Sequence, residues 1–239
     1  MKRIGFVGLG NMGARMVTNL LNVKYEVIGY DINEELVKQL LPKGLKKASD
    51  LNDMSQDIDI VITMLPNGEI VEEVLDSIID SLRPGTLVTD CSTIDVDKAK
   101  DLHKKCNKNG LLSLDAPVSG GVGGAEAGSL TFMVGGSDDA YKKMLPLFEV
   151  MGSKSVLCGP SGSGQATKAC NNMLLATTMI GVGETLSLGN NLGLDPKKLF
   201  EILSTSTGSC WAVNNYFPSE GIGPKSPADN NFKPGFSAI

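Results

Sequence analysis

The sequence predicts an α/β protein in which a doubly wound, largely parallel sheet is followed by an all-helical second part. Three observations support this: short apolar runs alternate with amphipathic stretches up to about residue 159, a glycine turn follows the first run, and the hydrophobic period then becomes helical. The chain has 239 residues. Since domains average roughly 150 residues, we expect one complete domain at 1–161 and a shorter helical part at 162–239.

Seven short apolar runs are the expected strands of the first domain, and the stretches between them have helical periodicity. Asn33 is expected to cap one of these helices, with Glu34 and Glu35 in its first turn. Pro84 and Gly85 end another. The expected strands are Arg3–Val7, Glu26–Tyr30, Ile58–Met64, Thr86–Thr89, Leu111–Asp115, Leu130–Val134 and Ser155–Cys158.

The second part begins with a single long helix. No proline occurs from Gln165 to about Leu192, and Gly193 stands where a helix-ending glycine is expected. A second helix should start at Asp195 as its N-cap, with Pro196 in the first helical position. Beyond Thr207 the composition turns to Asn, Pro, Gly and Ser, so we expect a long loop there.

Charge and hydropathy exclude several classes of partner. The net charge is −5 with no basic cluster, which argues against nucleic acid and anionic membranes. The longest apolar stretch, around Met173 to Val182, is well short of the ~20 residues that span a bilayer. Met1 lies just before the first strand, so we expect no signal or transit peptide within this sequence. These features favour a small molecule as the partner.

Cysteine and histidine usage narrows the possible chemistry. The five cysteines are widely spaced without a CxxC pair, which predicts neither a disulfide framework nor a zinc site and fits a reducing compartment. The single histidine, His103, excludes a multi-histidine metal site, and no metal is expected. His103 lies in a charged helical stretch and is expected at the surface. A general base is therefore expected to be Lys, Asp, Glu, Tyr or Cys.

A glycine turn, GLGNMG, stands between the first strand and a helical run. In this context the pattern predicts a Rossmann-type dinucleotide site: the first glycine permits the tight turn, the second lets the backbone approach a pyrophosphate, and the third packs the helix on the strand. Asp31 ends the second strand about 20 residues further on, where a carboxylate binds the ribose 2′-hydroxyl and repels a 2′-phosphate. We therefore predict NAD rather than NADP. The predicted cofactor residues are Gly8, Leu9, Gly10, Asn11, Met12, Gly13 and Asp31.

The alternative is a glycine turn that only packs a helix onto a sheet, with Asp31 as the cap of a loop. Two further strand ends should border the same crevice, because ligands of open α/β sheets lie outside the carboxyl ends of the strands. Met64, Leu65 and Pro66 follow one strand and would border the adenosine side; Thr93 follows the next and would lie near the nicotinamide. Ordinary loop packing explains both segments equally well.

Two segments are candidates for the substrate site. Ser119, Gly120 and Gly121 place a hydroxyl beside two unhindered N–H groups, which suits a carboxylate, although a flexible hairpin loop fits as well. Lys168 and Asn172 lie four residues apart near the start of the long helix. Burial beside the following apolar run would lower the pKa of Lys168 and make it a base near neutral pH. A surface lysine that extends its amine into solvent is the alternative.

The motifs FVGLGNMG, DCSTID, DAPVSGGVGGAEAGSLTFMVGG, GSGQATKACNNMLLA and LGLDP together resemble the 3-hydroxyisobutyrate dehydrogenases, within the β-hydroxyacid dehydrogenase group. The resemblance implies Lys168 as catalytic acid/base, Ser119, Gly120 and Gly121 as the carboxylate site, Asn172 as substrate ligand and Thr93 at the nicotinamide. It implies the NAD-dependent oxidation of 3-hydroxyisobutyrate to methylmalonate semialdehyde in valine degradation. The hydride would pass to nicotinamide while neutral Lys168 takes the hydroxyl proton.

The resemblance also implies features outside this sequence. Members of the family continue with further helices, one carrying a lysine that reaches the cofactor and substrate, and they form homo-oligomers once the helical domain is complete. A eukaryotic member would lie in the mitochondrial matrix and a bacterial one in the cytoplasm. Two alternatives stay open: a related tartronate or succinic semialdehyde reductase, and a non-catalytic dinucleotide-binding form.

Overall fold

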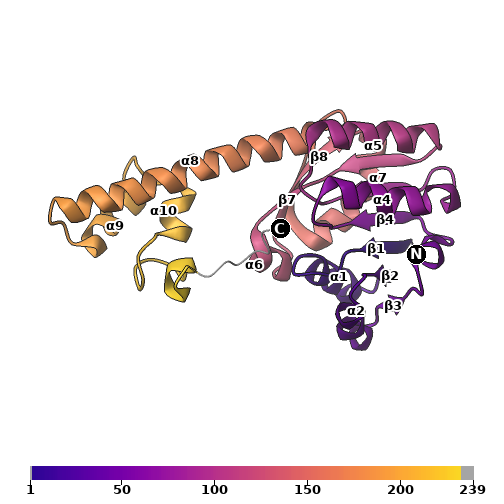
Figure 1. Cartoon of the computed structure of the whole chain (residues 1–239), viewed down its shortest axis with the longest axis horizontal. Coiled ribbons are helices and arrows are strands. Elements are labelled where there is room, and N and C mark those ends of the chain that lie inside the picture. Colours follow the sequence, from indigo (N-terminus) through magenta and orange to yellow (C-terminus); the bar gives the residue numbers. More distant parts are fainter. Residues whose placement is uncertain (1, 233–239) are drawn as a thin grey trace. The chain divides into compact units, whose positions relative to one another are not determined.

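The computed structural model describes residues 2–232. The chain divides into two compact units, Met1–Lys168 and Ala169–Ile239, and helix α8 begins in the first and continues into the second. The first unit contains a nine-stranded sheet with helices on both faces (Figure 1). Its strands are β1 Arg3–Val7, β2 Glu26–Tyr30, β3 Lys46–Lys47, β4 Ile60–Thr63, β5 Leu87–Asp90, β6 Leu112–Asp115, β7 Val118–Ser119, β8 Leu130–Gly136 and β9 Gly152–Gly159.

Helices connect the strands of the first unit and make up the second. Those of the first unit are α1 Gly13–Asn22, α2 Glu34–Leu40, α3 Leu51–Ser55, α4 Gly68–Ile78, α5 Val96–Lys108, α6 Gly121–Glu126 and α7 Asp138–Met151, with 3-10 turns at Leu41–Lys43 and Ile79–Ser81. Then come α8 Ser163–Asn191, α9 Pro196–Thr205, α10 Trp211–Tyr216 and a 3-10 turn at Pro227–Asn230.

The order of the strands confirms a doubly wound sheet. It runs β3-β2-β1-β4-β5-β6 with all neighbours parallel, and the order reverses on the two sides of β1. Beyond β6 the sheet departs from the expected parallel pattern, because β8 pairs with β6 antiparallel and β9 pairs with β8. The short strand β7 continues the register of β6 along β8.

Alternate residues of the central strands supply two separate cores. Ile4 and Phe6 of β1 pack on one face of the sheet with α1, α2 and α7, whereas Val7 packs on the other with α3, α4 and α5. On β4, Ile62 and Val61 divide in the same way. Because side chains alternate along a strand, fully apolar strands must be covered on both faces. The continuous apolar runs of the sequence therefore account for the helical layers on both sides.

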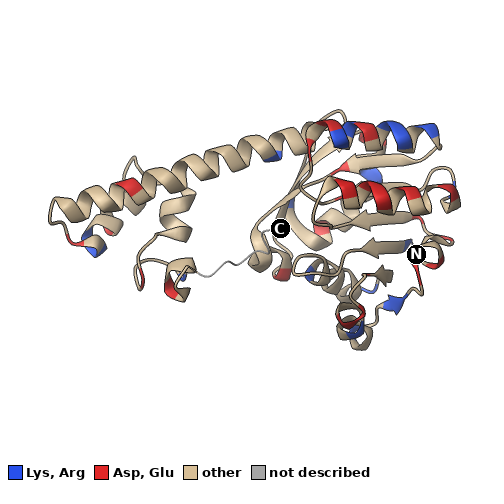
Figure 2. Ribbon diagram, in the orientation of Figure 1, with Lys and Arg blue, Asp and Glu red and all other residues tan. Residues whose placement is uncertain are grey.

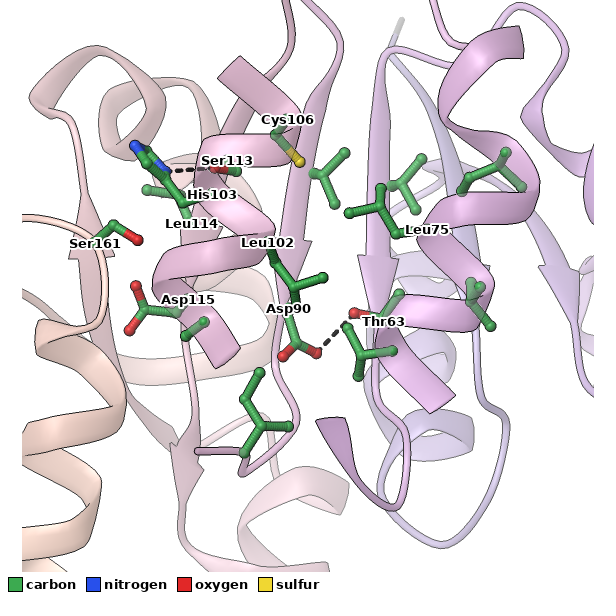
Figure 3. Close-up of a pocket in the computed structure, with 17 residues that line it drawn as sticks. Thr63, Leu75, Asp90, Leu102, His103, Cys106, Ser113, Leu114, Asp115 and Ser161 are labelled. Atoms are coloured by element: carbon green, nitrogen blue, oxygen red, sulfur yellow. Dashed lines mark hydrogen bonds between the residues drawn. The ribbon is translucent and has the colours of Figure 1, made fainter. Parts of the chain in front are cut away.

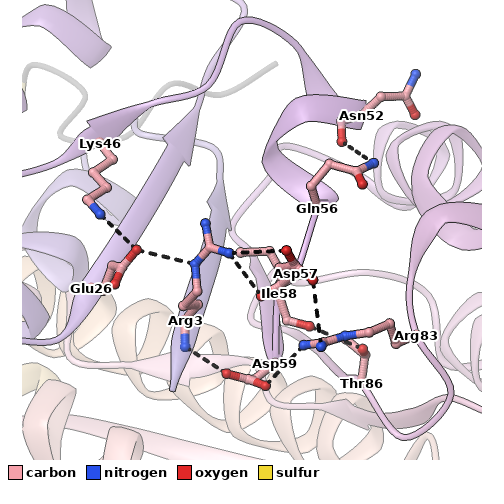
Figure 4. A network of polar contacts seen from close by, with 10 residues as sticks. All are labelled: Arg3, Glu26, Lys46, Asn52, Gln56, Asp57, Ile58, Asp59, Arg83 and Thr86. Atoms are coloured by element: carbon pink, nitrogen blue, oxygen red, sulfur yellow. Dashed lines mark hydrogen bonds and ion pairs between the residues drawn. The ribbon is translucent and has the colours of Figure 1, made fainter. Parts of the chain in front are cut away.

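A polar network joins the amino-terminal ends of the strands (Figure 4). Glu26 accepts from Arg3 at 3.2 Å and from Lys46 at 2.8 Å, which joins β1, β2 and β3. The Asp59 carboxylate accepts from the Arg3 backbone N–H at 2.8 Å and pairs with Arg83 at 3.4 Å. These side chains are only partly buried, so solvent screens the pairs and each adds little to stability. They lie at the edge of the sheet opposite the carboxyl ends of the parallel strands.

The second unit is built on the later part of α8. A small core of Val182, Ala212, Val213, Phe217 and Ile222 joins α8 to the segment after α9, and Phe200 meets Phe217 edge-on at 5.0 Å. Little charge is found along α8 (Figure 2), and several of its apolar side chains are exposed, Met173 by 69% and Ile180 by 68%. None of the helices within residues 2–232 combines the length and apolar character needed to cross a bilayer.

Several local expectations were wrong. The long loop predicted beyond Thr207 contains α10 and the 3-10 turn at Pro227–Asn230, because Ala212, Val213 and Phe217 are buried in the small core. The end of that predicted loop, 233–239, lies outside the described residues. Strands β3 and β7 were not predicted, since two residues carry no periodicity.

Candidate active site

Four loops meet at the carboxyl ends of β1, β2, β4 and β5, and backbone hydrogen bonds join them. The N–H of Gly8 donates to the carbonyl of Tyr30 at 3.0 Å, and that of Met64 donates to Val7 at 2.9 Å. The N–H of Cys91 donates to Thr63 at 2.8 Å. The parallel register therefore brings the predicted segments 8–13, 31, 64–66 and 91–93 to one edge of the sheet.

Two of the three glycines of the turn are required by close backbone contacts, and the third faces open space. Gly8 has φ +93°, and a Cβ there would collide with the carbonyl oxygen of Met64. A Cβ on Gly13 would collide with the carbonyl oxygen of Gly8, so only glycine lets α1 start this close to β1. A Cβ on Gly10 would meet no atom within 4 Å, so this position faces open space. Helix α1 begins there without a side-chain cap at Met12, although Ala14 and Arg15 already donate their N–H groups to the carbonyls of Gly10 and Met12 at 3.0 and 3.1 Å. The positive end of the helix dipole still favours an anion at this position.

Asp31 is tied to the glycine turn. Its Oδ2 accepts the N–H of Leu9 at 2.7 Å, and its Oδ1 accepts the N–H of Asn33 at 2.8 Å. Asn33 in turn caps α2, as the sequence predicted, by accepting from Glu35. Asp31 therefore caps the loop, which was the alternative given for it from the sequence. Each of its oxygens keeps a lone pair for a further donor.

Two buried carboxyl groups that the sequence reasoning missed lie behind these loops. Asp90 ends β5 and Asp115 ends β6, and they are directly paired in the register. Asp90 accepts from the Thr63 hydroxyl at 2.7 Å and from the Ser92 N–H at 3.1 Å, while its other oxygen has no partner within residues 2–232. Burial raises the pKa of both carboxyl groups. A carboxylate ending each of two apolar runs was the available signal.

Asp115 holds the start of α8. Its Oδ1 accepts the N–H of Gly162 at 2.7 Å, and its Oδ2 accepts the N–H of Gln165 at 3.0 Å. The first turn of a helix has unpaired N–H groups and a positive dipole end, and a carboxylate satisfies both. The long helix is thereby attached to the end of β6.

A small cavity of about 30 Å³ lies beside these carboxyl groups, between the sheet and helices α4 and α5 (Figure 3). His103 lines it and binds the Ser113 hydroxyl through Nδ1 at 2.6 Å. The prediction that His103 lies at the surface was therefore wrong: it is half-buried, and burial lowers its pKa. The buried Cys106 lines the same cavity, and burial raises its pKa to about 11. A thiol with that pKa is protonated near neutral pH and is a poor nucleophile.

Lys168 lies one turn after Gln165 on α8 and is half-buried. Burial lowers its pKa below that of a solvated lysine, in the direction that the sequence predicted. Asn172 follows four residues later on the same helix, is exposed, and belongs to the second unit. Thr93 is exposed beside the buried Ser92.

The segment Ser119–Gly121 is not a hairpin loop. Ser119 ends β7 and Gly121 begins α6, with φ +132° at Gly120 and φ +61° at Gly121. Helix α6 is held to α1 by Asn19, whose side-chain amide donates to the Ala125 carbonyl at 2.8 Å. No side-chain cap occupies the start of α6. Within residues 2–232, no group of three or more His, Cys, Asp or Glu side chains is arranged to hold a metal ion.

Two family models match nearly all of the chain. Residues 3–159 match the NAD binding domain of 6-phosphogluconate dehydrogenase, and residues 162–238 match the NAD-binding domain of NADP-dependent 3-hydroxyisobutyrate dehydrogenase. A probable 3-hydroxyisobutyrate dehydrogenase of Mycobacterium tuberculosis is 43% identical over 99% of this chain and 81% of its own length. The NAD-dependent L-serine dehydrogenase of Pseudomonas aeruginosa is 45% identical over 100% and 81%.

The mitochondrial 3-hydroxyisobutyrate dehydrogenase of Drosophila melanogaster is 44% identical over 99% of this chain and 74% of its own length. Among solved structures, that of the M. tuberculosis 3-hydroxyisobutyrate dehydrogenase with L-serine superposes with a TM-score of 0.94, at 43% identity over 99% of this chain and 81% of that one. The doubly wound sheet and its glycine turn, with these matches, define an NAD-dependent oxidoreductase. Within that class, the chain belongs to the 3-hydroxyisobutyrate dehydrogenase family.

We expect Asp115→Ala to destabilise the first unit, because it leaves the buried N–H groups of Gly162 and Gln165 without an acceptor. Each unpaired buried donor costs about 1–3 kcal/mol, whereas removal of the buried carboxylate recovers part of that cost. We therefore expect the free energy of unfolding to fall by about 2 kcal/mol or more. Urea unfolding followed by circular dichroism measures it. Asp97→Ala, on the exposed face of α5, is the control, with an expected change within about 0.5 kcal/mol. Equal stability of the two variants would contradict the anchoring role of Asp115.

Proposed function

We propose that this chain oxidises a small 3-hydroxy acid with NAD, and that the preferred substrate is 3-hydroxyisobutyrate, with methylmalonate semialdehyde as product. The observation that carries the proposal is the setting of Lys168: a half-buried lysine with a lowered pKa, one turn from the contacts that attach α8 to the strand ends. A lysine whose pKa is lowered in this way gives up its proton more readily than a solvated lysine, as a general base for a substrate hydroxyl must.

The glycine turn fits a dinucleotide. Gly10 faces open space, the first N–H groups of α1 have no side-chain cap, and Asp31 lies at the end of β2. A pyrophosphate would lie over the glycine turn at the positive end of the α1 dipole, and Asp31 would accept from a ribose hydroxyl. The residues proposed to hold NAD are Gly8, Leu9, Gly10, Asn11, Met12, Gly13, Asp31, Met64, Leu65, Pro66 and Thr93. Bound NAD supplies the acceptor for the hydride.

The chain's own residues handle the proton and the carboxylate. Neutral Lys168 takes the hydroxyl proton as the substrate carbon gives up its hydride, and its ammonium form returns that proton in the reverse direction. Ser119, Gly120 and Gly121 bind the carboxylate through the serine hydroxyl and the N–H groups at the start of α6. Asn172 binds the substrate hydroxyl or holds Lys168 in place.

L-serine is the second candidate substrate, because one relative at 45% identity is an L-serine dehydrogenase and the M. tuberculosis structure contains L-serine. In both acids the first carbon is the carboxylate and the third carbon carries the hydroxyl. They differ at the second carbon, where 3-hydroxyisobutyrate has a methyl group and serine an ammonium group. The choice between them depends on whether the site surrounds that group with apolar or with anionic side chains.

The same relatives suggest a place in the cell. We propose a step of valine degradation, in the mitochondrial matrix if the source is eukaryotic, as for the relatives from fly and mouse, and in the cytoplasm if it is bacterial.

The substrate is tested by steady-state reduction of NAD with four hydroxy acids. These are 3-hydroxyisobutyrate, L-serine and the two hydroxy acids that form when tartronate semialdehyde and succinic semialdehyde are reduced. We expect kcat/KM for 3-hydroxyisobutyrate to exceed that for serine by about tenfold or more, the discrimination that one apolar group supports. A preference for serine would assign the chain to the second candidate. NADH binding without turnover of any acid would indicate the non-catalytic alternative.

The acid/base role is tested by Lys168→Ala, with Lys154→Ala on the exposed part of β9 as the matched control. We expect kcat to fall by about 10²–10⁴-fold, the contribution of a general base, while the dissociation constant of NADH changes less than about threefold. In the wild type, oxidation should accelerate with rising pH as Lys168 loses its proton, with a midpoint below the pKa of a solvated lysine. Unchanged kcat in Lys168→Ala would eliminate this role.

The proposed role of Asp31 in selecting NAD over NADP is tested by Asp31→Asn, which keeps an acceptor for the Leu9 N–H and removes the charge. We expect the ratio of kcat/KM for NADP to that for NAD to rise about tenfold or more, because the repulsion of a 2′-phosphate is lost and 1.4 kcal/mol corresponds to a factor of ten. Asp50→Asn, which changes the cap of α3, is the control. A ratio that does not move would mean that another residue distinguishes the cofactors.

A further inference from the structure

Gln165 is a buried polar side chain near the start of α8 that the chemistry above does not use. Its side chain is almost fully enclosed, with 2% of the residue exposed. Its Oε1 accepts the N–H of Ile94 at 3.1 Å, and its Nε2 donates to the carbonyl of Ser92 at 2.8 Å. Because a buried amide without partners is costly, this complete pairing favours a single orientation of the side chain.

The two groups bound by Gln165 flank Thr93. Both peptide units next to Thr93 are therefore fixed by one side chain, although the side chain of Thr93 itself is exposed. Only an amide supplies a donor and an acceptor at these two positions. A carboxylate in its place would set an oxygen against the Ser92 carbonyl.

Ser92 extends the connection to the neighbouring loop. Its hydroxyl accepts the N–H of Leu65 at 2.9 Å, and its own N–H donates to Asp90 at 3.1 Å. The contacts of Gln165 therefore bear on the loop after β4 as well as the loop after β5. On the other side, the N–H of Gln165 donates to Asp115, which attaches the same helical turn to β6.

Lys168 lies one turn further along α8, so its backbone is fixed by these same contacts. We propose that Gln165 is a positioning residue of the reaction, an amide clamp that holds Thr93 and Lys168 at a set separation across the site. This inference rests on the function proposed above for Thr93 and Lys168. A shift of about 1 Å between reacting groups can cost about 10²-fold in rate, which makes such a clamp consequential.

The test compares Gln165→Met, which keeps the length of the side chain and removes both hydrogen bonds, with Gln56→Met, which removes an exposed amide on the first unit. Two experiments are carried out on the whole chain. The first measures the hydrogen-exchange rate of the Ile94 N–H, and the second measures kcat and the KM values for NAD and for the preferred hydroxy acid. The exchange of the Leu87 N–H, bonded to the Asp59 carbonyl, corrects for any change in global stability.

For Gln165→Met we expect Ile94 to exchange about tenfold faster or more relative to Leu87. We expect kcat to fall by about 10–100-fold while both KM values change less than about threefold, because alignment rather than binding is lost. Gln56→Met should change none of these. Gln165→Glu keeps the acceptor for Ile94 but loses the donor to Ser92, and it should also lower kcat; it serves as the second variant if the methionine variant does not fold.

Two results would overturn the clamp: unchanged exchange at Ile94, or faster exchange with unchanged kcat. These results are distinct from failure of the proposed function, in which the wild-type chain itself would turn over no hydroxy acid. In that case the positioning role falls with the function, while the exchange measurement still decides whether Gln165 fixes the segment around Thr93.

Discussion

The arrangement of the site depends on the carboxylate of Asp115. It ends a buried strand and receives the first N–H groups of a 29-residue helix. Desolvation raises the pKa of this group and thus opposes its charge, while the N–H groups and the helix dipole favour the charge. The carboxylate thus attaches the helix to the sheet through main-chain N–H groups. Because Lys168 lies one turn further along this helix, the backbone geometry fixes the position of its Cα.

The parts of the fold that sequence reasoning found are those with strong periodicity. The runs that became β1, β4 and β5 are apolar on both faces, and that pattern alone requires helices on both sides of the sheet. The strand β3 has two exposed lysines, and α10 lies in a segment rich in Asn and Pro, so burial in the folded chain rather than local composition decides both.

The glycine turn could be found from the sequence because its three glycines stand at fixed spacing between an apolar strand and a helix, and two of them, Gly8 and Gly13, leave no room for a side chain. Asp90 and Asp115 left only a weak signal, a carboxylate at the end of an apolar run, and Gln165 left none, because the partners named here lie 27 to 73 residues away. A polar residue at the end of an apolar run resembles the start of a loop. Only the register of β5 with β6 shows that Asp90 and Asp115 lie side by side. His103 was misjudged for the same reason, since its partner Ser113 lies on a strand beneath α5.

The ion-pair network around Arg3 and Asp59 lies at the edge of the sheet opposite the proposed site. Its charges are partly solvated and its contacts individually weak, so single changes there alter stability in small steps. The parallel sheet places this network at one end of its strands and the glycine turn at the other. Substitutions in the network can therefore change how stability responds to salt without touching the glycine turn.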